Sequence, residues 1–287
     1  MDLIINFTPT GMIPTKNMTP HVPVKVDEII EDVRLASEIG ITMVHLHARD
    51  ETTGKPAYQA EVYGKIIKGI RSFDRELIIC VSLSGRGIKE FVQRAEPLQL
   101  EGELKPDMGS LTLSSLNFNK VESLNSPDMI LALAAEMKSK GILPELEAFD
   151  MGMINYSKYL QKRGLLEPPH YFNLLFGNIA CAQADIMMAG LMVRELPTNS
   201  FCSFAGIGDT QLMMTSVAIA SDYGVRIGLE DNIWYDNQRT KLATNLDLIK
   251  RVHILAEANE RKIMKPSTLR NLLNLQAGNG QYGRKYE

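Results

Sequence analysis

The stretch Val44-His45-Leu46-His47-Ala48-Arg49-Asp50 completes a short apolar run that begins at Ile41 and is typical of a strand. Because side chains alternate along a strand, His45 and His47 point to the same face. Two imidazoles on one face are a pair of metal ligands if a third ligand arrives from another segment. The alternative is two histidines on a half-buried strand with ordinary hydrogen-bond partners, and the rest of the chain decides between the two.

The same kind of apolar run recurs along the chain, separated by segments with helical periodicity. Strands are predicted at 3–7, 41–47, 77–81, 108–113, 143–148, 171–176, 200–204 and 224–228. Helices are predicted at 26–38, 58–73, 88–100, 127–140, 151–163, 180–193, 211–220, 242–259 and 268–275. Strands that alternate with helices indicate a parallel sheet.

The length of 287 residues is close to the ~250 residues typical of a (β/α)8 barrel. We therefore predict an α/β fold, a TIM barrel that spans residues 1–287 as a single domain, with C-terminal helices and a tail from about residue 260. A doubly wound sheet is the alternative, but no GxGxxG motif opens the first strand–helix turn. The Gly-rich, polar tail from Gly278 is expected to be mobile or used in assembly.

Composition limits the classes of function. Hydrophobic residues make up 45% of the chain and charged residues 23%, with a net charge of −3. These values fit a soluble globular protein and give no electrostatic reason to expect nucleic acid or a membrane surface as partner. Neither a basic leader nor an apolar run of ~18 residues is present. Cys80, Cys181 and Cys202 form no CxxC motif and are expected to be buried free thiols of a reducing compartment, so we expect a cytoplasmic protein.

Polar residues gather at the ends of the predicted strands, where the active sites of such barrels lie. They are Thr8, Thr10, His45, His47, Ser82, Ser84, Ser110, Thr112, Glu145, Glu147, Arg226, Glu230 and Asp231. Side chains from so many strand ends, converging on one mouth of the barrel, favour a functional site over a core.

Glu230 is the natural third metal ligand, because strand eight lies two places from strand two around a closed barrel. Two histidines and one carboxylate leave an open coordination position for water or substrate. Zn²⁺ is the first choice, and Fe(II) uses the same ligand set. The alternative for Glu230 is a carboxylate that caps a helix.

Arg226 lies on the eighth predicted strand, just before Glu230 and Asp231. An arginine can orient a carboxylate through a two-pronged hydrogen bond, and Asp231 could then act as a general base. The alternative is a structural ion pair. Arg49, on the same face as His47, is a candidate either for a salt bridge or for binding a substrate carboxylate.

Taken together, these residues make the chain resemble the β-keto acid cleavage enzymes, a family whose prototype acts on 3-keto-5-aminohexanoate. The resemblance covers nearly the whole chain, and its specific parts are Val44-His45-Leu46-His47-Ala48-Arg49, Ser82-Leu83-Ser84-Gly85, Ser115-Leu116-Asn117-Phe118, Ala205-Gly206-Ile207-Gly208 and Arg226-Ile227-Gly228-Leu229-Glu230-Asp231-Asn232. It implies a (β/α)8 barrel that binds Zn²⁺ through His45, His47 and Glu230, and a homotetramer.

The resemblance also implies roles for the other residues. Ser82, Gly85, Ser110 and Thr112 would contact the substrate, and Asp231 would remove a proton from it with the help of Arg226 and Ser82. The implied reaction converts a 3-oxo acid and acetyl-CoA into acetoacetate and a new acyl-CoA.

One departure from the family prototype bears on the substrate. The prototype binds the substrate amino group through a glutamate in the loop after the first strand, whereas Thr10-Gly11-Met12-Ile13-Pro14-Thr15-Lys16 contains no acid. Ser110 and Thr112 also replace a threonine and an asparagine. We therefore expect a substrate without an amino group, either neutral or, with Lys16 as its partner, acidic.

Three other functions compete with this one. The first is a metal-dependent hydrolase or lyase of a small carboxylic acid on the same barrel, but the His-x-His pair of such hydrolases lies on the first strand, with further histidines on strands five and six. The second is a non-catalytic protein that keeps the metal pocket, against which Arg226 and Asp231 argue. The third is a structural metal site, which normally has four protein ligands.

Overall fold

Eight parallel strands form a closed barrel in the computed structural model, which describes residues 1–278 and 280–284. Their order around the barrel is β1-β12-β11-β10-β9-β6-β5-β2, and β2 pairs with β1 to close it. The strands are β1 (Ile5–Phe7), β2 (Met43–Leu46), β5 (Ile78–Val81), β6 (Met108–Thr112), β9 (Leu143–Ala148), β10 (His170–Phe176), β11 (Ser200–Gly206) and β12 (Gly224–Ile227). The predicted (β/α)8 barrel is confirmed, and the doubly wound alternative is excluded.

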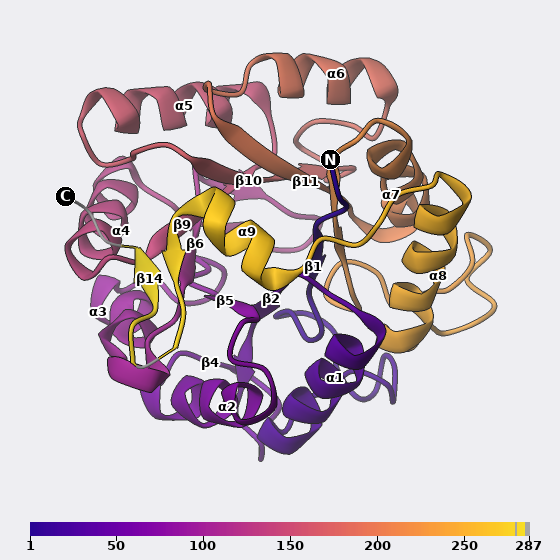
Figure 1. Cartoon of the computed structure of the whole chain (residues 1–287), viewed down its shortest axis with the longest axis horizontal. Coiled ribbons are helices and arrows are strands. Elements are labelled where there is room, and N and C mark those ends of the chain that lie inside the picture. The colour runs from indigo at the N-terminus through magenta and orange to yellow at the C-terminus, as the bar shows by residue number, and fades with distance from the viewer. Residues whose placement is uncertain (279, 285–287) are drawn as a thin grey trace.

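Helices form a ring around this barrel (Figure 1). They are α1 (Val26–Ile39), α2 (Ala60–Phe73), α3 (Phe91–Ala95), α4 (Pro127–Lys140), α5 (Met151–Lys162), α6 (Ile186–Arg194), α7 (Gln211–Ala220) and α8 (Asn245–Ala258). The last helix, α9 (Pro266–Leu273), lies outside this ring, across one end of the barrel. Short 3₁₀ segments occur at η1 (Glu96–Gln99), η2 (Gly102–Leu104) and η3 (Gly208–Thr210).

Most predicted helices agree with the structure to within three residues at each end, and two differ by more than that. The helix expected at 180–193 begins only at Ile186, because Asp185 caps its N-terminus by accepting a hydrogen bond from the Met188 amide at 2.8 Å. Cys181 therefore lies in a loop and is partly exposed, whereas Cys80 and Cys202 are buried as predicted. The segment expected at 88–100 is divided into α3 and η1, with Pro97 in the first turn of η1.

Within residues 1–278 and 280–284, three short antiparallel hairpins occur that the sequence analysis did not predict. Two lie in loops: β3 (Ala48–Arg49) with β4 (Pro56–Ala57), and β7 (Leu116–Asn117) with β8 (Glu122–Ser123). The third pairs β13 (Leu275–Gln276) with β14 (Gly283–Arg284). The tail from Gly278 was expected to be mobile or used in assembly; residues 283 and 284 are instead paired in this hairpin, with Tyr282 and Arg284 buried, and a role in assembly stays a prediction. For residues 279 and 285–287 that expectation lies outside the described residues.

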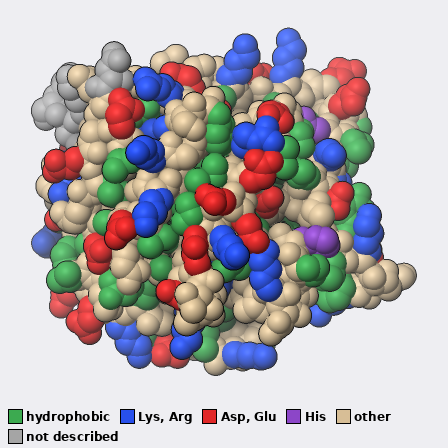
Figure 2. All heavy atoms as spheres, turned by 90° about the horizontal axis from the view of Figure 1, so that it is seen from below, with side chains coloured by type: hydrophobic (Ala, Val, Ile, Leu, Met, Phe, Trp, Pro, Cys, Tyr) green, Lys and Arg blue, Asp and Glu red, His purple; other side chains and the backbone are tan. Residues whose placement is uncertain are grey.

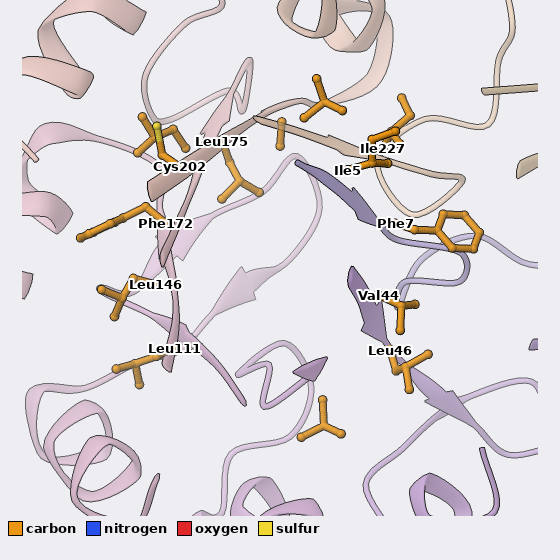
Figure 3. Packing of buried hydrophobic residues seen from close by; sticks show 14 of the residues in the cluster. Ile5, Phe7, Val44, Leu46, Leu111, Leu146, Phe172, Leu175, Cys202 and Ile227 are labelled. Atoms are coloured by element: carbon orange, nitrogen blue, oxygen red, sulfur yellow. The ribbon is translucent and has the colours of Figure 1, made fainter. Parts of the chain in front are cut away.

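Alternation along the strands sends apolar side chains to both sides of the barrel wall. Outward-facing residues such as Val44, Leu111, Leu146 and Ile227 pack in the main cluster, part of which Figure 3 shows. Inward-facing apolar residues form a second cluster, composed of Ile4, Met43, Ile78, Cys80, Met108, Leu143, Tyr171, Met264, Leu269, Leu273 and Leu275. The side chains two and four residues further along these strands are mostly polar, so the barrel interior changes from an apolar layer to a polar one.

Helix α9 closes the apolar end of the barrel. It lies across the end that faces the viewer in Figure 1, and Leu269 and Leu273 pack into the inner cluster. The polar layer is therefore left at the opposite end, where the strands finish. This is the mouth at which the sequence analysis placed the functional residues.

The face of the molecule in Figure 2 carries acidic and basic side chains interspersed rather than separated by sign. Among the described residues, no helix combines the length and the apolar character that crossing a membrane requires.

Candidate metal centre and active site

His45, His47 and Glu230 meet at the centre of the barrel mouth. The Nε2 atoms of the two histidines lie 3.2 Å apart, and the Nε2 of His47 lies 3.2 Å from Oε1 of Glu230. The three ligand atoms lie within 4.8 Å of one another. Strand order explains the meeting, because β2 and β12 both pair with β1 and so flank it.

These residues fit a tetrahedral metal ion. Two nitrogens bound to one zinc at about 2.0–2.1 Å in tetrahedral geometry lie about 3.3 Å apart, close to the separation of the two Nε2 atoms. The Oε2 atom of Glu230 is buried and has no hydrogen-bond partner within residues 1–278 and 280–284. An orphaned carboxylate oxygen beside two converging imidazole nitrogens is the donor set that a divalent cation would satisfy.

The loop after β1 is shaped to leave room for Glu230. Gly11 has a φ of +64°, and a Cβ atom at this position would lie 2.6 Å from Cγ of Glu230. A larger residue would be strained by its backbone conformation and would displace the carboxylate. The sequence analysis did not identify this role of Gly11.

A second carboxylate, that of Glu145, contacts the other ring nitrogen of His45. Oε2 of Glu145 lies 2.5 Å from Nδ1 of His45, and Oε1 of Glu145 accepts a hydrogen bond from the side-chain amide of Asn6 at 2.7 Å. Burial by itself would lower the pKa of His45, but the carboxylates of Glu145 and Glu230 together outweigh it and raise this pKa to about 8. This carboxylate–histidine pair puts a proton on Nδ1 and leaves Nε2 facing the mouth, as in many metal sites.

Replacing Glu145 with glutamine is expected to weaken divalent-metal binding by about 10- to 100-fold, because the amide holds the imidazole less firmly and makes it less basic. Competition with a chromophoric chelator measures the affinity. The exposed Glu61, replaced in the same way, provides the control and should leave the affinity unchanged. If Glu145→Gln bound the metal as tightly as the parent protein, the contact between Glu145 and His45 would make no contribution to metal affinity.

Arg226 is the charge centre of the mouth. Its Nη2 donates to Oε1 of Glu230 at 2.7 Å, its Nε donates to Oδ2 of Asp231 at 3.1 Å, and its Nη1 lies 3.5 Å from Oε1 of Glu147. The side chain is 2% exposed. Three carboxylates therefore contact one fixed guanidinium, and the Glu145 carboxylate acts on it electrostatically, so that the excess negative charge favours a bound cation.

Asp231 has the environment of a proton acceptor. Burial raises the pKa of its carboxyl group, and Arg226 opposes this, so that the pKa lies at about 6. A carboxyl group with its pKa raised towards neutrality can both take up and return a proton. The predicted pairing of Arg226 with Asp231 is present in the structure, in a geometry that leaves Oδ1 free of the arginine.

The other residues expected to bind substrate lie around this centre in different settings. Ser82 lines a small pocket beside His47, together with Met12, Tyr58, Ser84 and Gln93. Thr112 donates a hydrogen bond to Oε2 of Glu147 at 2.7 Å, and Ser110 accepts one from the amide of Leu83 at 3.0 Å. Their contact with substrate stays a prediction, but both hydroxyls already have partners within the protein.

Gly85 has a structural reason to be glycine. A Cβ atom there would lie 2.2 Å from the carbonyl oxygen of Leu124, so the loop after β5 packs directly on the backbone beside the β7–β8 hairpin. Its predicted contact with substrate also stays a prediction.

Arg49 and Lys16 are held by the protein itself. The guanidinium of Arg49 donates to the carbonyl oxygens of Gly11, Gly54 and Pro14, so it ties the loop after β1 to the β3–β4 hairpin. The ammonium group of Lys16 lies 3.0 Å from Oε1 of Glu28. In this structure both side chains therefore have partners within the protein.

Sequence reasoning noted Glu145 and Glu147 at a strand end but gave them no role, and it did not single out Asn6 or Arg86. Asn6 could have been noted in the same way as Glu145 and Glu147, because it is a polar residue within a predicted strand whose other residues are apolar. Among the described residues, two groups of side chains could hold a metal: His45, His47 and Glu230, and, behind them, His45, Cys80 and Glu145. The three remaining histidines, His21, His170 and His253, belong to neither group.

Comparisons with known proteins find relatives along nearly the whole chain. A family model described as beta-keto acid cleavage enzyme matches residues 2–275. The chain is 34% identical to 3-oxoadipate:acetyl-CoA acetyltransferase of Cupriavidus necator, over 95% of this chain and 94% of that protein. It is 32% identical to 3-keto-5-aminohexanoate cleavage enzyme of Fusobacterium nucleatum, over 95% of this chain and 98% of that protein. It is 30% identical to 3-dehydrocarnitine:acetyl-CoA trimethylamine transferase of Rhizobium meliloti, over 96% of this chain and 97% of that protein.

Solved structures share the fold. ObcA in its binary complex with oxaloacetate superposes with a TM-score of 0.79 at 18% identity, over 90% of this chain and 68% of that chain. A dihydropteroate synthase from Vibrio fischeri gives a TM-score of 0.51 at 12% identity, over 89% of this chain and 94% of that chain. At these identities the likeness supports the barrel alone.

Proposed function

This chain belongs to the beta-keto acid cleavage enzyme family, and we propose that it is a Zn²⁺-dependent acyltransferase that converts a 3-oxo acid and acetyl-CoA into acetoacetate and an acyl-CoA. The observation that carries the proposal is the convergence of His45, His47 and Glu230 beside the Arg226–Asp231 pair. The relatives named as acetyl-CoA transferases or cleavage enzymes support the type of reaction.

The proposed metal ion has a single chemical role. A divalent ion held by His45, His47 and Glu230 would act as a Lewis acid towards the ketone and carboxylate oxygens of a 3-oxo acid. The donor set of two imidazoles and one carboxylate suits Zn²⁺, with an open position for the substrate.

Asp231 would begin the reaction by removing a proton from the carbon between the ketone and the carboxylate. Its hydrogen bond from Arg226 orients the carboxylate, and its raised pKa makes it a stronger base than an exposed aspartate. The resulting carbanion attacks the thioester carbonyl of acetyl-CoA and expels the CoA thiolate.

The second half of the exchange breaks the original bond. The CoA thiolate attacks the ketone that belonged to the 3-oxo acid, and the carbon–carbon bond next to that ketone breaks. Acetoacetate leaves after Asp231 returns the proton, and the rest of the acid leaves as its CoA thioester. We propose that the hydroxyl of Ser82 and neighbouring backbone amides stabilise the oxyanion formed at each attack.

The test is an assay of acetoacetate formation from acetyl-CoA and a panel of 3-oxo acids, with and without prior chelation. We expect turnover of acids without an amino group, loss of turnover after chelation, and recovery with Zn²⁺ but not with Mg²⁺, which prefers oxygen ligands. His47→Gln should have less than about one tenth of the bound metal of the parent protein, because it leaves two ligands where a catalytic zinc needs three. Turnover that survives chelation and His47→Gln would refute the metal role, and a clear preference for the aminated acid would refute the substrate assignment.

A further inference from the structure

The positive charges around the barrel mouth differ in what they already bind. Arg226 is paired with the site carboxylates, Arg49 with three carbonyl oxygens, and Lys16 with Glu28. Arg94, which lines the pocket beside His47, donates to the carbonyl oxygens of Leu83 and Leu124 and to the side chain of Asn125. All four therefore have structural partners.

Arg86 is different. Its guanidinium carbon lies 3.5 Å from the centroid of the Phe118 ring, and its Nε is buried with no hydrogen-bond partner among the described residues. Burial lowers the pKa of Arg86, and the carboxylates of Glu230, Glu147 and Asp231 partly oppose this. Arg86 directly follows Ser82, Ser84 and Gly85 in the loop after β5, and Ser82 and Ser84 line the pocket beside His47, so this loop lies at the barrel mouth.

The surroundings of Arg86 fix its position. It follows Gly85, whose close contact with the Leu124 carbonyl oxygen holds the loop after β5 against the β7–β8 hairpin. Phe118 lies in that hairpin, where its amide donates to the carbonyl oxygen of Val121, and its ring packs edge-on against Phe149 with centroids 5.8 Å apart. Stacking on a braced ring restricts the plane of the guanidinium, so that its N–H groups are oriented before any ligand arrives.

A buried N–H without a partner is costly unless a ligand or water satisfies it. The Nε–H and a neighbouring Nη–H of a guanidinium form a fork that matches the two oxygens of a carboxylate. A cation bound at His45, His47 and Glu230 would offset the Glu230 charge that now acts on Arg86, and this would weaken the attraction between the guanidinium and the site carboxylates.

We infer that Arg86, stacked on Phe118, binds a second carboxylate at the far end of the substrate, so that this enzyme acts on 3-oxo dicarboxylic acids. The inference rests on the proposed function and specifies its substrate class. The first carboxylate and the ketone lie at the metal centre, the distal carboxylate lies on Arg86, and the product is a CoA thioester that keeps the distal carboxylate. The acidic partner foreseen for Lys16 is thus assigned to a different residue.

The phosphates of acetyl-CoA are the other possible source of an anion for Arg86, and the experiment separates the two. The Zn²⁺-loaded, full-length protein is assayed with 3-oxoadipate and 3-oxohexanoate, two acids with the same six-carbon chain but with a carboxylate or a methyl group at the far end. The variants are Arg86→Gln, Arg86→Lys, Phe118→Leu and, as a control for a cation already paired elsewhere, Lys16→Gln.

The parent protein is expected to prefer 3-oxoadipate. Arg86→Gln should lower kcat/KM for 3-oxoadipate by about 10- to 100-fold, mainly through KM, which corresponds to the loss of a charged hydrogen-bond pair. The same variant should keep its rate with 3-oxohexanoate and its KM for acetyl-CoA, which also shows that it folds. Arg86→Lys keeps the charge but not the fork, and Phe118→Leu removes the stacking, so both should show smaller losses in the same direction. Lys16→Gln should not change the preference.

Three results would overturn the inference: a parent protein that prefers 3-oxohexanoate, equal losses with both acids, or an Arg86→Gln variant that raises only the KM for acetyl-CoA. The last result would assign Arg86 to a phosphate of the coenzyme. If neither acid yields acetoacetate, the proposed function is refuted, and so is this inference, which rests on it. If 3-oxohexanoate is turned over and Arg86 has no influence on the choice of acid, only the inference falls.

Discussion

Replacing Asp231 with asparagine is expected to lower kcat for acetoacetate formation by about 10²- to 10⁴-fold, the usual contribution of a general base. Asparagine has nearly the same size and can still accept the hydrogen bond from Nε of Arg226, but it cannot take up a proton. The metal ligands His45, His47 and Glu230 are unchanged in this variant. Metal content and thermal midpoint should therefore remain close to those of the parent protein.

Single-turnover kinetics together with metal analysis measure both parts of this expectation. Asp209→Asn is the matched control, because Asp209 is exposed and lies 3.9 Å from Arg239 at the surface. That variant should retain full activity. An Asp231→Asn protein that turns over at the parental rate would remove Asp231 from the role of base, and one that has lost its metal would assign it to holding the centre together.

Replacing Asp107 with alanine is expected to lower the free energy of unfolding by about 3–5 kcal/mol, as removal of one partner from a buried ion pair does. Asp107 is 0% exposed, and its two oxygens lie 2.7 and 2.8 Å from the guanidinium of Arg270. The amides of Ile79 and Gly283 also donate to it, at 3.0 and 3.2 Å. Without the carboxylate, Arg270 would remain buried beneath the barrel without its counterion.

Urea unfolding monitored by circular dichroism measures this loss. Glu31→Ala is the control, because Glu31 pairs with Arg34 on an exposed helix surface and its removal should cost less than about 1 kcal/mol. A loss below 1 kcal/mol for Asp107→Ala would show that the network around α9 and the β13–β14 hairpin adds little to stability. The activity of the folded fraction should be unchanged, because this network lies at the opposite end of the barrel from the mouth.

The barrel could be predicted from the sequence because the patterns that indicate it involve residues close together in the chain. Strand and helix periodicities depend on neighbours within a few residues, and their alternation restricts the topology to a parallel sheet. The same local alternation indicated that His45 and His47 share a face. Helix starts were less certain, and α6 began six residues later than predicted because Asp185 forms a better N-cap than the residues before it.

What the sequence determined by itself was the type of fold, the shared face of His45 and His47, and the position of Glu230 and Asp231 at the end of the eighth strand. The tertiary structure alone decided which of the polar groups meet. It brought Glu145 to His45 across 100 residues and Asp107 to Arg270 across 163. It also gave Arg49 and Lys16 partners, whereas Nε of Arg86 has none in the part of the chain that the structure describes. The physical reason is that side-chain direction follows from local backbone geometry, whereas a hydrogen bond or ion pair depends on distances that only the closed barrel sets.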